Sequence, residues 1–145
     1  MFTTNVFDYT NILDKAADAS WMRENVITNN IANIDTPGYK RQDVDFESVL
    51  QKALGKTKYS SLDKKVRELN QDLGKLTTTS YTDAANYSYR LDHNNVDENT
   101  ENAELASESL RYQLLTTAIT NNFSMNADGS KVIEYILLRT FDCHG

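Results

Sequence analysis

The chain is poor in the residues that build disulfide, metal and catalytic centres. Of its 145 residues, one is cysteine and two are histidine. An internal disulfide is therefore impossible, and the nitrogen and sulfur ligands that zinc requires are scarce. No phosphate-loop, dinucleotide-binding, nucleophile-elbow or zinc-protease motif occurs in the sequence. We expect no metal, no cofactor and no catalytic residue.

The chain also lacks a long basic run and a long apolar run. Its net charge is -6, so nucleic acid is not an expected partner, because phosphate neutralisation requires clustered Lys and Arg. The longest apolar stretch, Val132 to Leu138, is interrupted by Glu134, whereas a membrane span needs about 20 residues. The first residues have no signal-peptide pattern. We expect no direct membrane insertion and no cleaved signal.

The scarcity of proline and glycine leaves room for a long N-terminal helix. The segment from Phe2 to about Ile31 has neither residue, and its apolar positions recur with helical spacing. A helix of this extent is about 45 Å long, which is typical of coiled coils and bundles. Its apolar stripe consists of Phe2, Val6, Tyr9, Leu13, Ala16, Ala17, Ile27 and Ile31.

A second helix is predicted from Asn99, as its N-cap, to Met125, and it has two apolar stripes. One stripe contains Leu105, Tyr112, Leu115, Ile119 and Phe123, and the other contains Ala103, Ala106, Leu110 and Leu114. We expect the first stripe to pack within one subunit against Val6, Leu13 and Ile27, which leaves the second for another molecule. The alternative is a small monomeric bundle that buries both stripes on itself.

The middle of the chain predicts a turn, short helices and an extended segment. Thr36-Pro37-Gly38-Tyr39 has the residues of a type II turn. A short helix is expected from Phe46 to Leu54, capped by Asp43 and Asp45 and stopped by Gly55, and another from Leu62 to Leu76, closed by Gly74. From 77 to 91 the pattern favours extended or hairpin structure, with Tyr87, Tyr89 and Leu91 alternating, as an interface or a loop.

The expected fold is mainly α. Long N- and C-terminal helices form an antiparallel, coiled-coil pair, and short helices with a small β segment lie between them. One assembly domain is expected, divided into a core helix at 1–34, a variable middle at 35–98, a core helix at 99–125 and an atypical tail at 126–145.

Three separated segments carry a resemblance to a known family. Residues 29–40 resemble the signature of bacterial flagellar axial proteins of the rod and hook class. Residues 92–97 and 104–113 are similar to two later stretches of that class, in the same order, and 43–47 are most similar to one of its two related proximal rod proteins. The signature turn comprises Asn30, Ile31, Ala32, Asn33, Asp35, Thr36, Pro37, Gly38 and Tyr39.

The resemblance implies a structural subunit of the flagellar rod, the driveshaft that transmits torque across the cell envelope. The terminal helices would pack into the core of a helical tube, and the subunit would leave the cytoplasm through the flagellar type III export apparatus. Implied partners are copies of the chain, other rod proteins, the MS ring and the export-gate adaptor FliE.

Two positions depart from the family pattern. His93 stands where the family commonly has glycine, so the tight turn there is expected to differ. Asn126 to Ser130 predicts a turn where the family helix continues, which puts the end of the core packing in doubt.

Two other classes of protein compete with the rod subunit. An enzyme could use Asp43, Asp45 and Glu47 as an acid and base cluster, but carboxylates at a helix start are more often caps. A soluble helical adaptor or secretion chaperone would share the acidity and the amphipathic helices. It should fold alone, whereas a rod subunit should order its terminal helices largely on docking.

Overall fold

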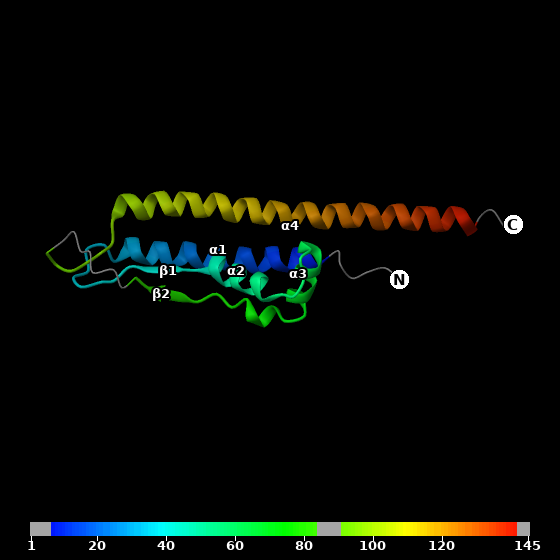
Figure 1. Cartoon of the computed structure of the whole chain (residues 1–145). Coiled ribbons are helices and arrows are strands. Elements are labelled where there is room, and N and C mark those ends of the chain that lie inside the picture. The colour runs from blue at the N-terminus through cyan, green and yellow to red at the C-terminus, as the bar shows by residue number, and fades with distance from the viewer. Residues whose placement is uncertain (1–6, 84–90, 142–145) are drawn as a thin grey trace.

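Two long antiparallel helices and a small layer beside them make up the fold. The computed structural model describes residues 7–83 and 91–141, with the side chains of the last helix described as far as Met125. The elements are α1 (Asp8–Ala32), β1 (Gln42–Val44), α2 (Phe46–Lys56), α3 (Leu62–Asn70), the 3-10 turn η2 (Leu73–Lys75), β2 (Ser80–Thr82) and α4 (Glu98–Phe141). Helix α1 lies between α4 on one side and the short elements on the other (Figure 1). The expected mainly α fold is confirmed.

The two long helices differ greatly in length. Helix α1 has 25 residues and α4 has 44, so α4 continues well beyond the start of α1 (Figure 1). At the start of α1, the rings of Phe7 and Phe123 lie 6.1 Å apart. The first positions of the expected N-terminal stripe, Phe2 and Val6, lie outside the described residues.

The short elements cover one side of α1 with a small apolar core. Ala19 of α1 is buried together with Phe46 of α2 and Leu76 after η2. Asp45 caps α2 as expected, because its carboxylate accepts a hydrogen bond from the Ser48 amide at 3.0 Å. The short helix at Phe46 is therefore confirmed.

A two-stranded antiparallel sheet joins the beginning and the end of the middle region. Strand β1 pairs with β2 in the register Gln42 with Thr82, Asp43 with Tyr81 and Val44 with Ser80. The extended segment predicted from residue 77 is confirmed at β2. Strand β1 was not expected, and Tyr87 and Tyr89 of the predicted alternation lie outside the described residues.

Glycine was a poor guide to where helices end. Gly55 lies inside α2, which ends at Lys56, and Gly74 lies in η2 because α3 already ends at Asn70.

The turn expected at Asn126 to Ser130 is wrong, because α4 continues as helix to Phe141. A single glycine in a helix costs only about 1 kcal/mol, and the segment contains no proline. Helix α4 also begins at Glu98, one residue before the expected cap Asn99.

The second apolar stripe of α4 is uncovered. Leu110 is 62% exposed and Leu114 72% exposed, and Ala103 and Ala106 are exposed as well. A monomeric bundle that buries both stripes is therefore not the observed arrangement. Within the described residues, no helix has the combined length and hydrophobicity that crossing a bilayer requires.

His93 adopts a left-handed backbone conformation. Its φ is 63°, and it is the one residue other than glycine with positive φ in the described ranges, 7–83 and 91–141. Glycine adopts this conformation readily, whereas a residue with a Cβ does not, so the histidine occupies this turn under strain. A left-handed residue with a Cβ costs about 1 kcal/mol or more relative to glycine.

We therefore expect His93→Gly to stabilise the subunit by about 1 kcal/mol, measured as the free energy of urea unfolding. The matched control is Leu91→Gly, at an exposed loop position without positive φ. It should leave stability unchanged or lower it, because glycine there only adds freedom to the unfolded chain. Equal effects of the two changes would contradict backbone strain at His93.

Candidate functional site

The three segments that resemble the rod and hook class lie close together toward one end of the α1–α4 pair. We call this place the helix-pair junction. It combines polar side chains of α1, of the β1 strand and its approach, of the loop before α4 and of α4 itself. They are Ser20, Arg23, Asn30, Arg41, Asp43, Asn94, Glu101, Glu104 and Glu108.

Asn30 of the signature segment joins three elements through one fully buried amide. Its nitrogen donates to the carbonyl of Gln42 at 2.8 Å and to the Glu101 carboxylate at 2.9 Å. Its oxygen accepts from the Gln42 amide at 3.0 Å and from the Tyr39 hydroxyl at 3.2 Å. The side chain thus pairs with both backbone groups of Gln42, as a neighbouring strand would, and holds β1 against α1.

Asn94 holds the turn that follows α1. Its buried side-chain nitrogen lies 3.0 Å from the carbonyl oxygen of Asn33, 2.9 Å from that of Ile34 and 3.0 Å from that of Thr36. These carbonyls end the helix and begin the turn, where they have no partner within the helix. Asn94 therefore fixes the direction in which the chain leaves α1.

The Pro37 turn has the geometry that its sequence predicts. Gly38 has a φ of 73°, and the Tyr39 amide donates to the Thr36 carbonyl at 3.2 Å, as in a type II turn. The Gly38 amide also donates to the carbonyl of Asp92 at 2.9 Å. The first two family-like segments are therefore joined backbone to backbone.

Arg23 of α1 binds carboxylates from two elements. Its guanidinium donates to Asp43 at 2.9 Å, to Glu104 at 3.1 Å and to Glu108 at 3.3 Å. The other carboxylate oxygen of Glu108 accepts a hydrogen bond from the Ser20 hydroxyl at 2.5 Å. Because Glu108 is 4% exposed, these donors are what makes its burial tolerable.

Arg41 also pairs with three carboxylates, and its partners on α4 lie one helical turn nearer to the start of that helix. It donates to Glu101 at 2.5 Å, to Glu104 at 3.0 Å and to Asp43 at 3.1 Å. Glu104 and Asp43 thus each accept from both arginines. The two guanidinium groups and four carboxylates form a continuous network between α1, β1 and α4.

The network favours the charged forms of Asp43, Arg23 and Arg41. Burial alone raises the pKa of Asp43, but bonds from the Val44 amide and from Arg23, with the charge of Arg41, hold it below its ordinary value. Burial alone lowers the pKa of Arg23 and of Arg41, and the surrounding carboxylates reverse this, so both are raised. The ion pairs that Asp43 makes with Arg23 and Arg41 therefore persist at neutral pH.

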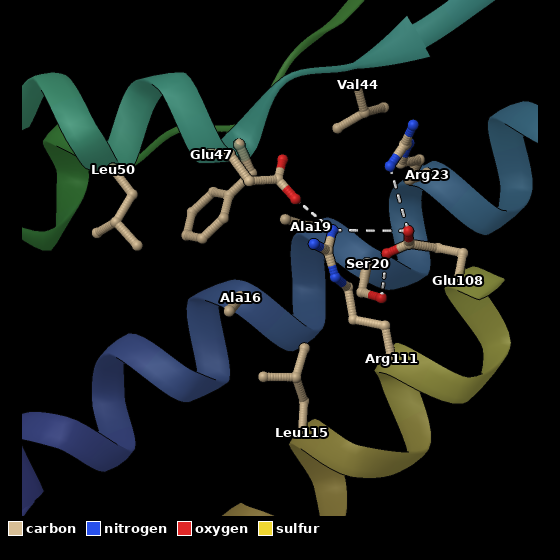
Figure 2. A pocket seen from close by; sticks show the side chains of 11 residues that line it. Ala16, Ala19, Ser20, Arg23, Val44, Glu47, Leu50, Glu108, Arg111 and Leu115 are labelled. Atoms are coloured by element: carbon tan, nitrogen blue, oxygen red, sulfur yellow. Dashed lines mark hydrogen bonds and ion pairs between the residues drawn. The ribbon is translucent and has the colours of Figure 1, made fainter. Parts of the chain in front are cut away.

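A hollow of about 200 Å³ lies beside the junction, between α1, α2 and α4. Figure 2 shows Arg111 of α4 reaching across it to Glu47 of α2, with Glu108 on its other side. Ala16, Leu50 and Leu115 line its apolar part (Figure 2). An exposed ion pair between α4 and α2 thus spans the hollow.

The three acidic residues weighed as a catalytic cluster all have structural partners. Asp43 is in the ion network, Asp45 caps α2 and Glu47 pairs with Arg111. Ser20 donates to Glu108, which also pairs with Arg23, so this carboxylate is an anchored acceptor rather than a free base. In the described part of the chain, no group of His, Cys, Asp and Glu is arranged to hold a metal.

The predicted signature residues divide into a buried centre and an exposed rim. The centre is Asn30, which accepts a hydrogen bond from the Tyr39 hydroxyl. Two signature residues are partly buried, Ile31 and Asn33. The exposed rim consists of Ala32, Asp35, Thr36, Pro37 and Gly38. The Asn33 side chain donates to the Asn29 carbonyl at 2.8 Å and so caps the end of α1 locally.

The predicted helix-packing residues are covered to different degrees. Ile27 is fully buried, and Leu13, Leu105, Tyr112, Leu115 and Ile119 are partly buried. Phe123 is 51% exposed and contacts Phe7, whereas Val6 lies outside the described residues. The direct pairing of the two stripes within one subunit stays a prediction.

The charged residues of the junction were missed because only apolar residues were sought along the helices. Four residues of α1 follow the alternating three- and four-residue spacing of a helix-packing seam: Ser20, Arg23, Ile27 and Asn30. On α4, Glu101 and Glu108 are one heptad apart. Polar residues at seam positions were the available signal. The partners Arg41 and Asp43 lie far from α4 in sequence, so no local pattern relates them to it.

Known proteins match this junction and its surroundings. A family model described as "Flagella basal body rod protein" matches residues 22–40, which run from the Arg23 region through the Pro37 turn. The chain is 32% identical to flagellar basal body rod protein FlgB of Bacillus subtilis (strain 168) over 114 residues, 77% of this chain and 84% of that relative. It is 35% identical to FlgB of Escherichia coli (strain K12), over 67% of this chain and 74% of the relative.

The class defined by this fold and these matches is the flagellar basal body rod proteins, which are structural proteins. Within that class, the chain belongs to the FlgB family. FlgB of Borreliella burgdorferi (strain ATCC 35210 / DSM 4680 / CIP 102532 / B31) is similar to it as well, with 32% identity over 83% of that relative. The resemblance at Asp43 to Glu47 favours FlgB over the related rod protein FlgC, and that prediction is confirmed.

We expect Asn30→Ala to destabilise the subunit by about 3 kcal/mol, because it leaves the backbone groups of Gln42 without the Asn30 amide and removes one of the two donors to the buried Glu101 carboxylate. The measurement is the free energy of urea unfolding. Asn29→Ala is the matched control, since Asn29 is the exposed neighbour of the same residue type. It should cost less than about 0.5 kcal/mol. Similar losses at the two positions would contradict a special role of Asn30.

Proposed function

We propose that the chain is built into the proximal part of the flagellar rod, with its α1–α4 pair in the inner core of the tube. As a member of the FlgB family, it is a structural subunit of the basal-body rod. The finer proposal concerns how it is held there. Each subunit uses one face of α4 for its own α1 and a second face for a neighbour.

The observation that carries this proposal is the uncovered stripe of α4. Leu110 and Leu114 are 62% and 72% exposed on a helix whose opposite side is occupied by α1. Trp21 of α1, 60% exposed, adds a second apolar contact area on the same pair. Apolar surface exposed along a helix is typical of surfaces that are covered on assembly.

A contact that is repeated from subunit to subunit explains how such helix faces produce a tube. When the two surfaces of a contact differ, the same contact can be repeated from subunit to subunit, and a rotation that does not close produces a helical polymer. A long helix with apolar stripes on two sides supplies two different surfaces. Copies of the chain and other rod proteins are the neighbours we propose for the stripe.

The other expectations from the family belong to the same proposal. The subunit leaves the cytoplasm through the flagellar type III export apparatus, and it meets the MS ring and the adaptor FliE at the base of the rod. It acts through packing and transmits torque, and it catalyses no reaction. The partnered state of Asp43, Asp45 and Glu47 supports a structural role for these carboxylates.

A soluble helical adaptor or secretion chaperone is the remaining alternative. Such a protein would cover its apolar stripes by folding or dimerising alone. The exposure of Leu110 and Leu114 in the single chain, together with the family membership, favours the rod subunit.

We expect Leu114→Asp to block rod assembly in the bacterium that carries this gene, because burying an unpaired carboxylate in the contact costs several kcal/mol. The variant replaces the chromosomal gene, and swimming and isolated basal bodies are examined. Export of the variant should persist, since Leu114 points away from α1 and is exposed in the subunit. Asn102→Asp, on an exposed part of α4 outside the stripe, is the control and should swim normally. Normal rods with Leu114→Asp would contradict the proposal.

A further inference from the structure

The hollow between α1, α2 and α4 has an apolar wall. Ala16 of α1, Leu50 of α2 and Leu115 of α4 line it (Figure 2). All three are partly buried, so the wall lies between the surface of the subunit and its core. Apolar side chains lose dispersion contacts while the space beside them is not filled by other apolar groups. The hollow therefore favours an apolar occupant.

The polar side chains around the hollow do not require a polar occupant. Glu108 has its donors in the junction, and Arg111 pairs with Glu47 across the opening. Among the described residues, the buried side-chain atoms without a hydrogen bond belong to Thr10 and Glu68, and neither residue lines the hollow. A buried water typically makes about three hydrogen bonds, so an apolar group suits this hollow better than water does.

The volume of the hollow corresponds to one aliphatic side chain. It measures about 200 Å³, whereas pockets that take drug-sized ligands have about 300 to 1,000 Å³. Truncation of one buried leucine leaves a cavity of about 150 Å³. A leucine side chain therefore fits the hollow, and a large cofactor does not.

The opening of the hollow can admit a side chain at little cost. Arg111 and Glu47 span it as an ion pair, and their side chains are 49% and 56% exposed. An ion pair this exposed contributes little stability, so its two side chains can move apart when another group enters. The aliphatic stem of Arg111 would then cover the occupant, while its guanidinium stays in water.

The outer stripe of α4 presents a suitable side chain at the same level of the helix. Leu114 is 72% exposed and directly precedes Leu115, which lines the hollow. Successive residues of a helix point about 100° apart, so these two leucines face different sides of α4. The projecting side chain and the hollow thus lie at one height on different faces. Two copies placed side by side at that height can bring them together.

We propose that the hollow of one subunit receives Leu114 of a second copy of this chain that lies beside it. The inference rests on the proposed function, because it identifies the surface that covers the outer stripe of α4. The two surfaces of the contact differ, so each subunit offers its hollow to one neighbour and its stripe to another. The same contact can then recur from copy to copy.

The size of the contact suits an assembled rod rather than a free dimer. Leu110 and Leu114 expose an apolar patch on the order of a few hundred Å², whereas a stable interface buries about 1,200 to 2,000 Å². One leucine in one hollow is therefore too small a contact to hold two free subunits together. Once other contacts bring subunits side by side, filling the hollow adds apolar burial and fixes their relative height.

Filling the hollow from within the subunit tests the proposal. Ala16→Leu occupies the space from the α1 side, and with this variant in the chromosomal gene we expect about tenfold fewer basal bodies, because Leu114 of the neighbour is excluded. Thr28→Leu adds the same side chain at an exposed position of α1 outside the hollow, and this control should assemble normally. Purified Ala16→Leu should unfold at the same urea concentration as the natural chain or a higher one, since filling a hollow does not destabilise the subunit.

Shortening the projecting side chain should restore assembly. In Ala16→Leu with Leu114→Ala, every copy has a smaller hollow and a smaller side chain to fit it. The number of basal bodies should return to within about twofold of the natural number. Leu110→Ala is the matched control in the same background, because it shortens the neighbouring leucine of the stripe and should not restore assembly.

Disulfide formation reads the contact between copies directly. Two chains are produced together, one with Leu50→Cys and the other with Leu114→Cys, and both carry Cys143→Ser. Isolated basal bodies are oxidised, and the joined peptides are identified by mass spectrometry. A bridge between positions 50 and 114 requires the two Cα atoms to lie within about 7 Å, and it can form only between different chains.

The proposal is overturned if Ala16→Leu assembles normally, if Leu114→Ala fails to restore it, or if no bridge joins positions 50 and 114 in basal bodies that have formed. Blocked assembly that Leu114→Ala does not restore assigns the hollow to another rod protein instead of a second copy. In each of these cases, rods blocked by Leu114→Asp leave the proposed function in place. Normal rods with Leu114→Asp contradict the covering of the stripe itself.

Discussion

Two buried carboxylates on α4 determine how the long helices pair. Glu101 is fully buried and Glu108 is 4% exposed, and a buried carboxylate without donors costs several kcal/mol. Glu101 finds its donors in Asn30 and Arg41, and Glu108 finds its donors in Ser20 and Arg23. Sliding α4 along α1 by one heptad would bring one of these glutamates to the donors of the other and would leave the second glutamate without its donors. Apolar residues alone would tolerate such a slide, so the charged junction sets the register of the pair.

The same junction connects the register of the helices to the rest of the fold. Arg41 and Asp43 bring β1 into the network, and the Asn30 amide pairs with the backbone of Gln42 beside them. Asn94 fixes the turn after α1, so the chain enters α4 from a defined direction. The outer stripe of α4, with Leu110 and Leu114, is thereby held in a defined position relative to α1. A subunit that must be stacked repeatedly needs this fixed relation between its contact surfaces.

The sequence predicted the long helices, the Pro37 turn, the cap at Asp45 and the exposed stripe, because each depends on residues close together in the chain. It did not predict β1, whose three residues, Gln42 to Val44, are held by Asn30 and by β2 rather than by their own pattern. The partners of Arg23 were equally hidden, since Glu104 and Glu108 lie about 80 positions away. The turn expected at Asn126 failed because one glycine does not stop a helix that has no proline. The family-like segments did contain Asn30, Asn94, Glu104 and Glu108 of the junction, but nothing in their sequence indicated which contacts they make.

Native-state hydrogen exchange of the free subunit tests most directly whether the junction orders the helix pair. If Glu101 and Glu108 anchor α4, the amides from Leu105 to Tyr112 exchange only through rare opening and are the most protected of the helix, and the ordering on docking expected from the sequence is limited to the parts of the long helices outside the junction. Protection then declines toward Phe123, where α4 reaches the start of α1 and apolar contacts replace the ion network. Exchange as fast as that of an unfolded peptide throughout α4, or protection strongest near Phe123, would contradict an anchoring role of the junction.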